Sequence, residues 1–354
     1  MANDLLDVHV VLDVASPALP VNLGNLAVFI VQTGTNDVIT DVEVSSFQEI
    51  SDRGLSLGAE ATAIAKGFFA QDGHGESLFI YGVPNSIDGS ETTKKLEMVL
   101  SDGWEFGAIV PATQNDIVAM SNAVEEYGRK FLVVSGTGFD KDVASAITAL
   151  ESVATAPFYG NNRTFMIGGT DEQQYYNIGA VVGAVGNKTP GSTTWKFRSM
   201  NGSDALKVNG SVVSVATKND VNLYVMKAGK AQTSEGLTLS GDYIDALLAD
   251  DWIRAELESQ IQDLLQSSDK IPYDATGIAQ IEAVVTTVLR TATDNGIILM
   301  DPETNGGRFT VTAGSRDQQS AADVAARKYS DISFEYTRAG AIHDVTIHGT
   351  VGNV

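Results

Sequence analysis

The chain has 354 residues, no cysteine and a formal net charge of -22, with a hydrophobic content of 43%. This length predicts two domains, and the composition predicts a folded chain. The negative charge argues against surfaces that bind nucleic acid or anionic lipid, and the lack of cysteine excludes disulfides and thiolate zinc sites. No leader-like start and no apolar run of membrane-spanning length is present, so we expect synthesis in the cytoplasm.

Residues 1–20 are predicted to be an N-terminal arm with a linker. Residues 5–14 read L-L-D-V-H-V-V-L-D-V, which indicates a strand. One face of that strand would carry Val8, Val10, Leu12 and Val14. Pro17 and Pro20 then end the strand and favour an extended connector. A lone strand ahead of such a connector needs a partner from elsewhere.

Residues 21–190 alternate between strand and helix patterns, which predicts an α/β layered domain with a largely parallel sheet. Strands are expected at residues 26–34, 77–84, 106–111, 131–136 and 164–169, and helices at residues 57–71, after Asn115, after Asp140 and at 171–185. Asn115 and Asp140 are the expected N-caps of their helices. Gly179 and Gly183 inside the last helix indicate close packing against a neighbour.

Residues 186–203 are rich in turn formers, so a domain boundary is expected there and a second domain at residues 195–339. This second domain is expected to begin with a short helix at residues 211–218 and a strand at residues 220–228. Two long helices follow, one starting near Ser240 and one capped by Asp274 and ending at Gly296. Strands are then expected at residues 309–314, 332–337 and 341–351.

The last of these strands lies in a C-terminal arm, residues 340–354. One face of the strand would hold His343, Val345, Ile347 and Val351. It could be an edge strand of its own domain or a strand supplied to a neighbour by β-augmentation. Residue chemistry alone favours neither alternative. Amphipathic runs at both chain ends favour exchange, because an exposed strand edge invites pairing with another chain.

Catalytic chemistry finds little support in the sequence. The glycine loops match neither G-x-G-x-x-G nor a P-loop, and Gly136 and Gly138 ahead of Asp140 come closest to an anion-binding helix start. The four histidines form no metal-binding frame. Asp250 and Asp251 point about 100° apart on a helix, which indicates a solvated face rather than a carboxylate pair. We therefore expect no enzyme activity and no catalytic, cofactor-binding or metal-binding residue. The alternative is a soluble α/β enzyme that binds a nucleotide or sugar phosphate at residues 136–140.

Several motifs occur in a fixed order over about residues 220–351. They are N-L-Y-V, G-D-Y-I-D, D-D-W-I, K-I-P-Y-D-A-T-G-I, N-G-I-I, S-A-A-D-V-A-A-R and A-G-A-I-H-D-V-T-I-H-G. In this order they resemble the C-terminal half of the sheath protein of contractile phage tails and of phage-tail-like particles, the tailocins. The chain is short for that family and is similar to a minimal version of it. Another tail component is a further alternative, although a tube protein would be smaller and mostly β.

The resemblance implies a structural protein of the virion tail, with an overall α+β fold. Its copies would stack as rings, usually hexameric, around an inner tail tube and would contact baseplate and tail terminator proteins. Residues 21–190 would face outward and residues 195–339 inward. The arms, with Val8, Val10, Leu12 and Val14 at one end and Val345, Ile347 and Val351 at the other, would enter sheets of neighbouring subunits. The receiving strand would include Ile332, Phe334 and Tyr336. Contraction would then drive the tube through the cell envelope for genome ejection, without a cofactor.

Overall fold

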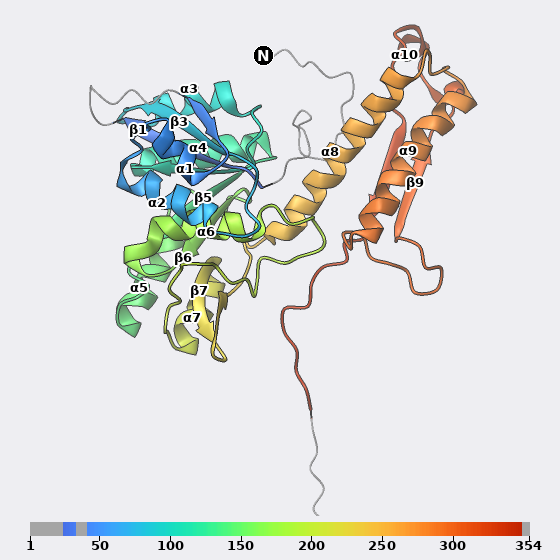
Figure 1. The fold of residues 1–354 in the computed structure, drawn as a ribbon. Helices are drawn as coiled ribbons and strands as arrows, with labels where there is room; N and C mark the ends of the chain where they lie inside the picture. The colour runs from blue at the N-terminus through green and yellow to red at the C-terminus, as the bar shows by residue number, and fades with distance from the viewer. Residues whose placement is uncertain (1–23, 33–40, 349–354) are drawn as a thin grey trace, which may run out of the picture.

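The computed structural model describes residues 24–32 and 41–348. In this part of the chain, an α/β domain is followed by a long helix that leads into a separate C-terminal unit of helices and two strands (Figure 1). The predicted fold class, an α/β layered domain with a C-terminal α+β part, is confirmed. The predicted strand at residues 5–14, with Val8, Val10, Leu12 and Val14, and the position of Val351 lie outside the described residues.

The α/β domain is organised on an eight-stranded sheet with the order β2-β3-β1-β4-β5-β6-β7-β8. Its strands are β1 (Leu26–Gln32), β2 (Val42–Val44), β3 (Leu78–Pro84), β4 (Phe106–Val110), β5 (Phe131–Gly136), β6 (Thr164–Gly168), β7 (Val221–Lys227) and β8 (Lys230–Thr233). The six central strands are parallel, as predicted, and the two edge strands β2 and β8 are antiparallel to their neighbours. The sequence pattern predicted the long strands but not the three-residue β2.

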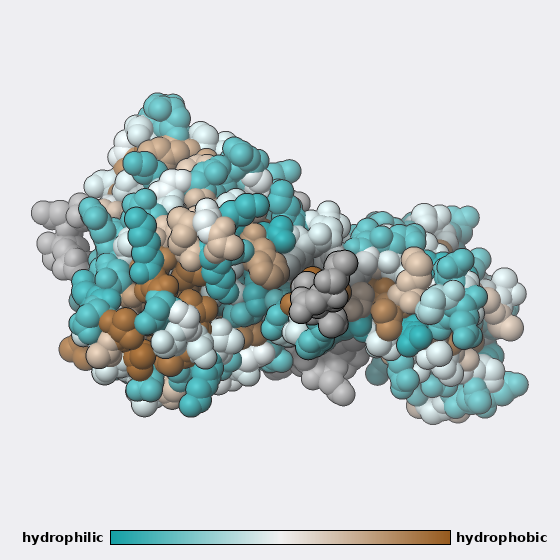
Figure 2. Space-filling view, turned by 90° about the horizontal axis from the view of Figure 1, so that it is seen from below, coloured by the Kyte–Doolittle hydropathy of each residue, from teal (hydrophilic) through white to brown (hydrophobic). Residues whose placement is uncertain are grey.

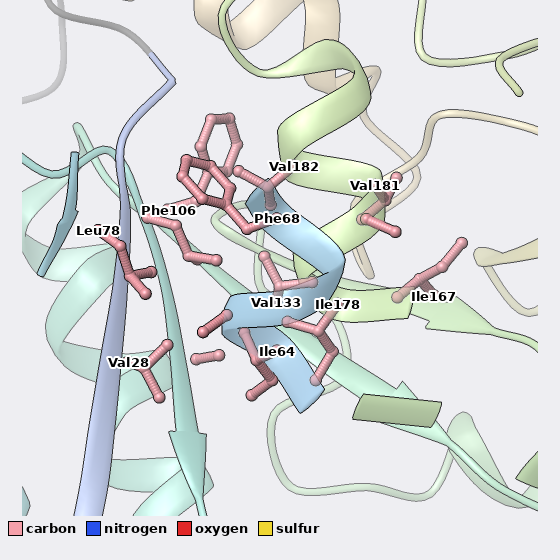
Figure 3. Close-up of a cluster of buried hydrophobic side chains, with 14 of the residues drawn as sticks. Val28, Ile64, Phe68, Leu78, Phe106, Val133, Ile167, Ile178, Val181 and Val182 are labelled. Atoms are coloured by element: carbon pink, nitrogen blue, oxygen red, sulfur yellow. The ribbon is translucent and has the colours of Figure 1, made fainter. Parts of the chain in front are cut away.

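Helices cover both faces of this sheet. One face carries α1 (Phe47–Asp52), α2 (Gly58–Phe69) and α6 (Gln174–Val185), and the other carries α3 (Ser90–Val99), α4 (Gln114–Tyr127), α5 (Val143–Val153) and α7 (Gly210–Lys218). Successive residues of β1 alternate between the two cores, with Val28 in the first and Phe29 in the second. Figure 3 shows Val28 of β1 in the first core together with Ile64 and Phe68 of α2. Two apolar layers therefore bury both faces of the central parallel strands, as parallel sheets require.

Close packing of α2 against α6 depends on glycine. A Cβ atom added at Gly179 would lie 1.9 Å from the carbonyl oxygen of Ile64, and one at Gly183 would lie 2.5 Å from that of Phe68. The predicted close approach at these two glycines is confirmed. The two helix backbones come together because neither position carries a side chain.

Helix starts differ in part from the sequence predictions. Thr113 caps α4 with a capping box, and Asp142 caps α5, so the expectations for Asn115 and Asp140 were wrong by two residues in each case. Asp274 caps α9 (Ala275–Asp294) as predicted. The helix expected from about Ser240 is α8 (Ile244–Ser267). It begins later because Thr238 N–H donates to the Asp242 carbonyl and closes a turn there.

The sheet continues past the boundary that the sequence suggested near residue 190. Strand β7 pairs with β6 in parallel and β8 pairs with β7, so residues 221–233 belong to the α/β domain. The turn-rich residues 186–203 are a connection within that domain. In space, the chain divides at α8, which starts on the α/β domain and extends away from it (Figure 1). The inward and outward roles of the two parts remain predictions.

The C-terminal unit consists of the distal half of α8, helix α9 and a two-stranded sheet. Its other elements are β9 (Phe309–Ala313), η2 (Arg316–Gln318), α10 (Ala321–Ala325) and β10 (Ile332–Tyr336). A small core joins Ile253 and Leu257 of α8 to Val288 and Leu289 of α9. The apolar residues of the two strands pack against this core.

Candidate assembly site

The two-stranded sheet has one apolar and one polar face. β9 and β10 pair antiparallel, with Phe334 opposite Val311 and Tyr336 opposite Phe309. Phe309, Val311, Ile332, Phe334 and Tyr336 pack against the core between the helices but stay partly exposed, and the residues between them are exposed. This sheet is therefore only half covered in the single subunit.

The backbone pattern shows which residues of β10 offer free hydrogen-bonding groups. The N–H of Gly314 donates to the Asp331 carbonyl, and the N–H of Thr337 donates to the Arg308 carbonyl. Hydrogen-bonded and non-hydrogen-bonded pairs alternate along an antiparallel ladder. The N–H and C=O groups of Ser333 and Glu335 therefore point toward β9, and those of Ile332, Phe334 and Tyr336 point to the outer edge. Within the described residues no third strand pairs with β9 or β10.

The described part of the C-terminal arm presents apolar side chains to water. Ile342, Val345 and Ile347 are 80%, 70% and 87% exposed. No strand is assigned at residues 341–348, where the sequence predicted one. The segment leaves the C-terminal unit and extends away from the body of the molecule (Figure 1). A strand needs a partner ladder, and within one subunit this segment has none among the described residues.

Helix α8 is fixed to the α/β domain by two buried ion pairs. The guanidinium of Arg129 donates to both carboxylate oxygens of Glu258, with N–O distances of 2.9 and 2.6 Å. Arg163 donates in the same bidentate manner to Asp251. All four side chains are at most 5% exposed. Bidentate pairs of this kind fix orientation as well as distance, so α8 is held rigidly from its third turn to about the middle of its length.

The carboxylates of Asp250 and Asp251 do not lie on a solvated face, and that prediction was wrong. Asp251 is buried against Arg163. Asp250 accepts hydrogen bonds from the Tyr336 hydroxyl and from Arg338, which follows β10. The 100° between them points one carboxylate at the α/β domain and the other at the two-stranded sheet. These adjacent residues connect the two parts of the molecule through α8.

Two further ionisable groups are buried near this junction. Burial, reinforced by the charge of Asp251, raises the pKa of Glu105 to about 8. Burial lowers the pKa of Lys130 to about 8, and its ammonium donates to the Asp102 carbonyl and lies over the Trp104 ring. Backbone carbonyls accept hydrogen bonds from Lys130, whereas one carboxyl oxygen of Glu105 is buried without a hydrogen-bond partner.

The loop proposed for phosphate binding is closed by the protein's own carboxylates. The N–H of Gly138 donates to Asp171, whose other oxygen lies 2.8 Å from the Lys141 ammonium. A phosphate placed at residues 136–140 would face Asp171 and Asp140. Among the described residues, no group of three or more His, Asp and Glu side chains could hold a metal ion. None of the helices in that part of the chain has the length and apolar composition of a membrane span.

The C-terminal part of the chain matches a known protein family. Residues 244–351 match the family described as E217 tail sheath protein gp31-like, C-terminal domain. The match covers α8, α9, both strands of the small sheet and the arm to residue 351. No curated protein matches the chain.

Solved sheath structures share the fold over nearly the whole chain. A chain of the anti-feeding prophage baseplate matches with a TM-score of 0.66 at 11% identity, covering 98% of this chain and 99% of its own. The anti-feeding prophage helical sheath in its contracted state matches with a TM-score of 0.64 at 10% identity, covering 95% and 94%. The sheath tail protein of Listeria innocua matches with a TM-score of 0.57 at 11% identity, covering 83% and 89%. The resemblance to contractile tail sheath proteins is confirmed, and the α/β domain has the sheath fold as well.

The sequence anticipated the strand residues of this site but not the ion pairs. Ile332, Phe334 and Tyr336 lie on β10 as predicted, and Val345 and Ile347 lie on the exposed arm. Their roles in subunit contact remain predictions. Arg129 and Glu258 are 129 residues apart in the chain, so local patterns could not pair them. The available signal was the charged residues Asp251, Arg254 and Glu258 on the apolar side of α8.

Proposed function

We propose that the chain is the structural subunit of a contractile tail sheath. It polymerises around an inner tail tube through strands exchanged between neighbouring subunits, and it contracts to drive the tube through a cell envelope. The sheath family match of residues 244–351 and the shared fold support a sheath subunit. One observation carries the exchange itself: a single chain holds both an open strand edge on β10 and an exposed apolar segment with alternating residues.

Complementarity between these two features is the physical basis of exchange. The outer edge of β10 offers the backbone groups of Ile332, Phe334 and Tyr336. A strand laid along it would gain ladder hydrogen bonds of about 0.5–1.5 kcal/mol each. Val345 and Ile347 are two residues apart, so both side chains would enter the same face of the extended sheet. Burying such a side chain stabilises a complex by roughly 1.5–3 kcal/mol.

Backbone pairing suits a link that has to persist while subunits move. Ladder hydrogen bonds depend little on side-chain identity, and an extended segment tolerates rotation of the bodies that it joins. The energy for contraction would lie in the difference between two packings of the same subunits, so the chain requires no nucleotide. The rigid attachment of α8 through Arg129 and Arg163 would let each subunit rotate as one body.

The proposed partners follow from the same assembly. They are further copies of the chain in stacked, hexameric rings, an inner tail tube protein, and baseplate and tail terminator proteins. The location is the virion tail, after synthesis in the host cytoplasm. We also propose that the N-terminal arm, with Val8, Val10, Leu12 and Val14, enters a neighbouring sheet, and that Val351 does so from the other end.

Electron microscopy of the purified full-length chain tests the proposal. Tubes or stacked rings are the expected result, and a uniform population of compact monomers or dimers would contradict it. The variant Ile347→Asp places a charge on the exchanged strand and is expected to abolish tubes. The matched control is Ile87→Asp, because Ile87 is equally exposed at 91% but lies on the α/β domain. Equal loss of tubes in both variants would refute a specific role of the arm.

A further inference from the structure

One residue of the C-terminal arm differs from all its described neighbours. From residue 340 to residue 348 every residue is exposed except His343, whose side chain is 12% exposed. Ile342 on one side of it is 80% exposed. An otherwise solvated segment is thus held at a single point.

His343 sits in a pocket with a polar contact and two aromatic walls. Its Nε2 atom lies 2.8 Å from the hydroxyl oxygen of Thr194. The ring of Tyr243 meets the imidazole edge to face, with centroids 5.0 Å apart, and the ring of Phe197 stands 6.1 Å away. On the other side, Nδ1 lies 3.8 Å from a carboxylate oxygen of Glu235. Edge-to-face aromatic contacts of this kind are favourable beyond the area that they bury.

The pocket is built by the α/β domain and the start of α8, not by the C-terminal unit. Phe197 N–H donates to the Thr233 carbonyl of β8, and Glu235 pairs with Lys196 at 2.7 Å. Tyr243 is the residue that precedes α8. The arm therefore leaves the C-terminal unit and attaches to the other part of the same subunit.

One residue of the pocket wall has a strained backbone conformation. Phe197 has a φ of +66°, in the left-handed region that non-glycine residues seldom occupy. That conformation sets its 45% exposed ring beside His343 instead of in a core. Such strained residues persist where surrounding contacts hold them, and they concentrate at binding sites. On the arm side, Gly340 also has a positive φ, +66°.

We propose that Thr194, Phe197, Glu235 and Tyr243 form an intramolecular binding site for the imidazole of His343, which latches the root of the C-terminal arm to the α/β domain. The latch fixes the point and direction at which the arm leaves the subunit. Without it, no described residue from position 340 to position 348 would be shielded from solvent. Pre-ordering a segment lowers the entropy lost when it binds. The effect on assembly rests on the proposed strand exchange, whereas the latch itself is a property of the single subunit.

Distance measurements between two spin labels test the latch on soluble full-length subunits. The chain has no cysteine, so labels attach only at Lys230→Cys on β8 and Ile347→Cys on the arm. We expect a narrow distance distribution in this parent. Adding His343→Ala removes one hydrogen bond and the aromatic contacts, which is expected to lower the ratio of docked to free arm roughly tenfold and broaden the distribution.

Thr194→Val provides a second variant that changes the pocket without touching the arm. It is expected to broaden the distribution less than His343→Ala, and the two effects should not add when combined. The matched control is His348→Ala, which removes the same side chain from an exposed position five residues further along and should leave the distribution unchanged. Identical distributions in the parent, His343→Ala and Thr194→Val would overturn the proposal.

Assembly gives the readout that separates the latch from the strand exchange. With the native residues kept at positions 230 and 347, His343→Ala is expected to slow tube growth several-fold while its melting temperature stays unchanged. Unchanged growth would overturn the assembly role of the latch. If the native chain forms no tubes at all, the proposed sheath function fails, and the label distances still decide whether His343 holds the arm.

Discussion

The sheets of the α/β domain and of the C-terminal unit differ in how readily their edge strands can pair with another chain. The eight-stranded sheet ends in β2 and β8, which have only three and four residues and run antiparallel to their neighbours. Short edge strands with charged residues such as Lys230 discourage pairing with other chains. The small sheet instead consists of two five-residue strands, each with an outer edge that no described strand covers. The edges of the eight-stranded sheet therefore disfavour pairing with another chain, whereas the edges of the two-stranded sheet allow it.

The strands of the two parts also differ in how far their residues are buried. In β1, six of seven residues are buried, whereas no residue of β9 or β10 is buried. Figure 2 shows the two lobes, with hydrophilic residues spread over much of this face of both. The comparison teaches that the α/β domain buries its sheet within a single subunit, whereas the C-terminal sheet stays partly exposed and would be completed by neighbours under the proposed strand exchange. Changes in the first part should therefore alter folding, and changes in the arm should alter assembly.

The largest effect on folding is expected at the junction between the two parts. Glu258→Ala removes one partner of a buried ion pair, a change that typically costs about 3–5 kcal/mol of unfolding free energy. Urea unfolding of soluble subunits measures it. The control is Glu91→Ala in the exposed pair with Lys94, where little change is expected. Equal losses in both variants would show that the junction is not specially stabilised by this pair.

A smaller loss is expected from the α2–α6 contact. Gly179→Ala introduces a Cβ atom against the Ile64 carbonyl and forces the helices apart, which costs about 1–3 kcal/mol or more. Gly210→Ala is the matched control, because Gly210 lies in α7 and an added Cβ would meet nothing within 4 Å. Thermal unfolding should separate the two variants clearly. A Gly179→Ala protein as stable as Gly210→Ala would contradict the close packing.

A pH-dependent effect is expected from Glu105. Its folded-state pKa, about 8, lies above that of an unfolded carboxyl group, so the folded state binds the proton more tightly. Its contribution to stability is therefore complete below about pH 4 and is lost as the pH rises toward 8. Glu105→Gln should flatten the decline of stability between pH 5 and 8, measured by urea unfolding. An unaltered pH profile in the variant would contradict the raised pKa.

The smallest change in folding is expected from the arm. Ile347→Ala should leave the unfolding free energy unchanged, because Ile347 is exposed in the single subunit. It should nevertheless raise the protein concentration needed for tubes, since the side chain would be buried between subunits. Light scattering against concentration measures this threshold. A variant with an unchanged threshold would place Ile347 outside the subunit contact.

Local signals in the sequence predicted local structure well. Short apolar runs predicted β1 and β6, and Asp274 predicted the start of α9. Features that depend on residues far apart in the sequence could not be predicted from local patterns. The pairing of β7 with β6 placed residues 221–233 in the first domain, although turn formers at 186–203 suggested a boundary. The pocket for His343 joins residues about 150 positions apart, and no local pattern indicates it.

Neither the sequence alone nor the structure of one subunit shows which strand the C-terminal arm pairs with. Its alternating pattern predicts a strand at residues 341–351, yet the described residues 341–348 form none in one subunit. A strand exists only with its ladder partner, and the proposed partner belongs to another molecule. Under the proposed exchange, the periodicity would mark a strand that forms only in the assembly.

Removal of residues 340–354 tests the central proposal, strand donation by the C-terminal arm, most directly. The shortened chain retains both sheets and the ion pairs of α8, so circular dichroism and thermal unfolding should match the full-length protein. Electron microscopy should then show dispersed subunits where the full-length chain forms tubes. Tubes of normal length from a folded, shortened chain would contradict it.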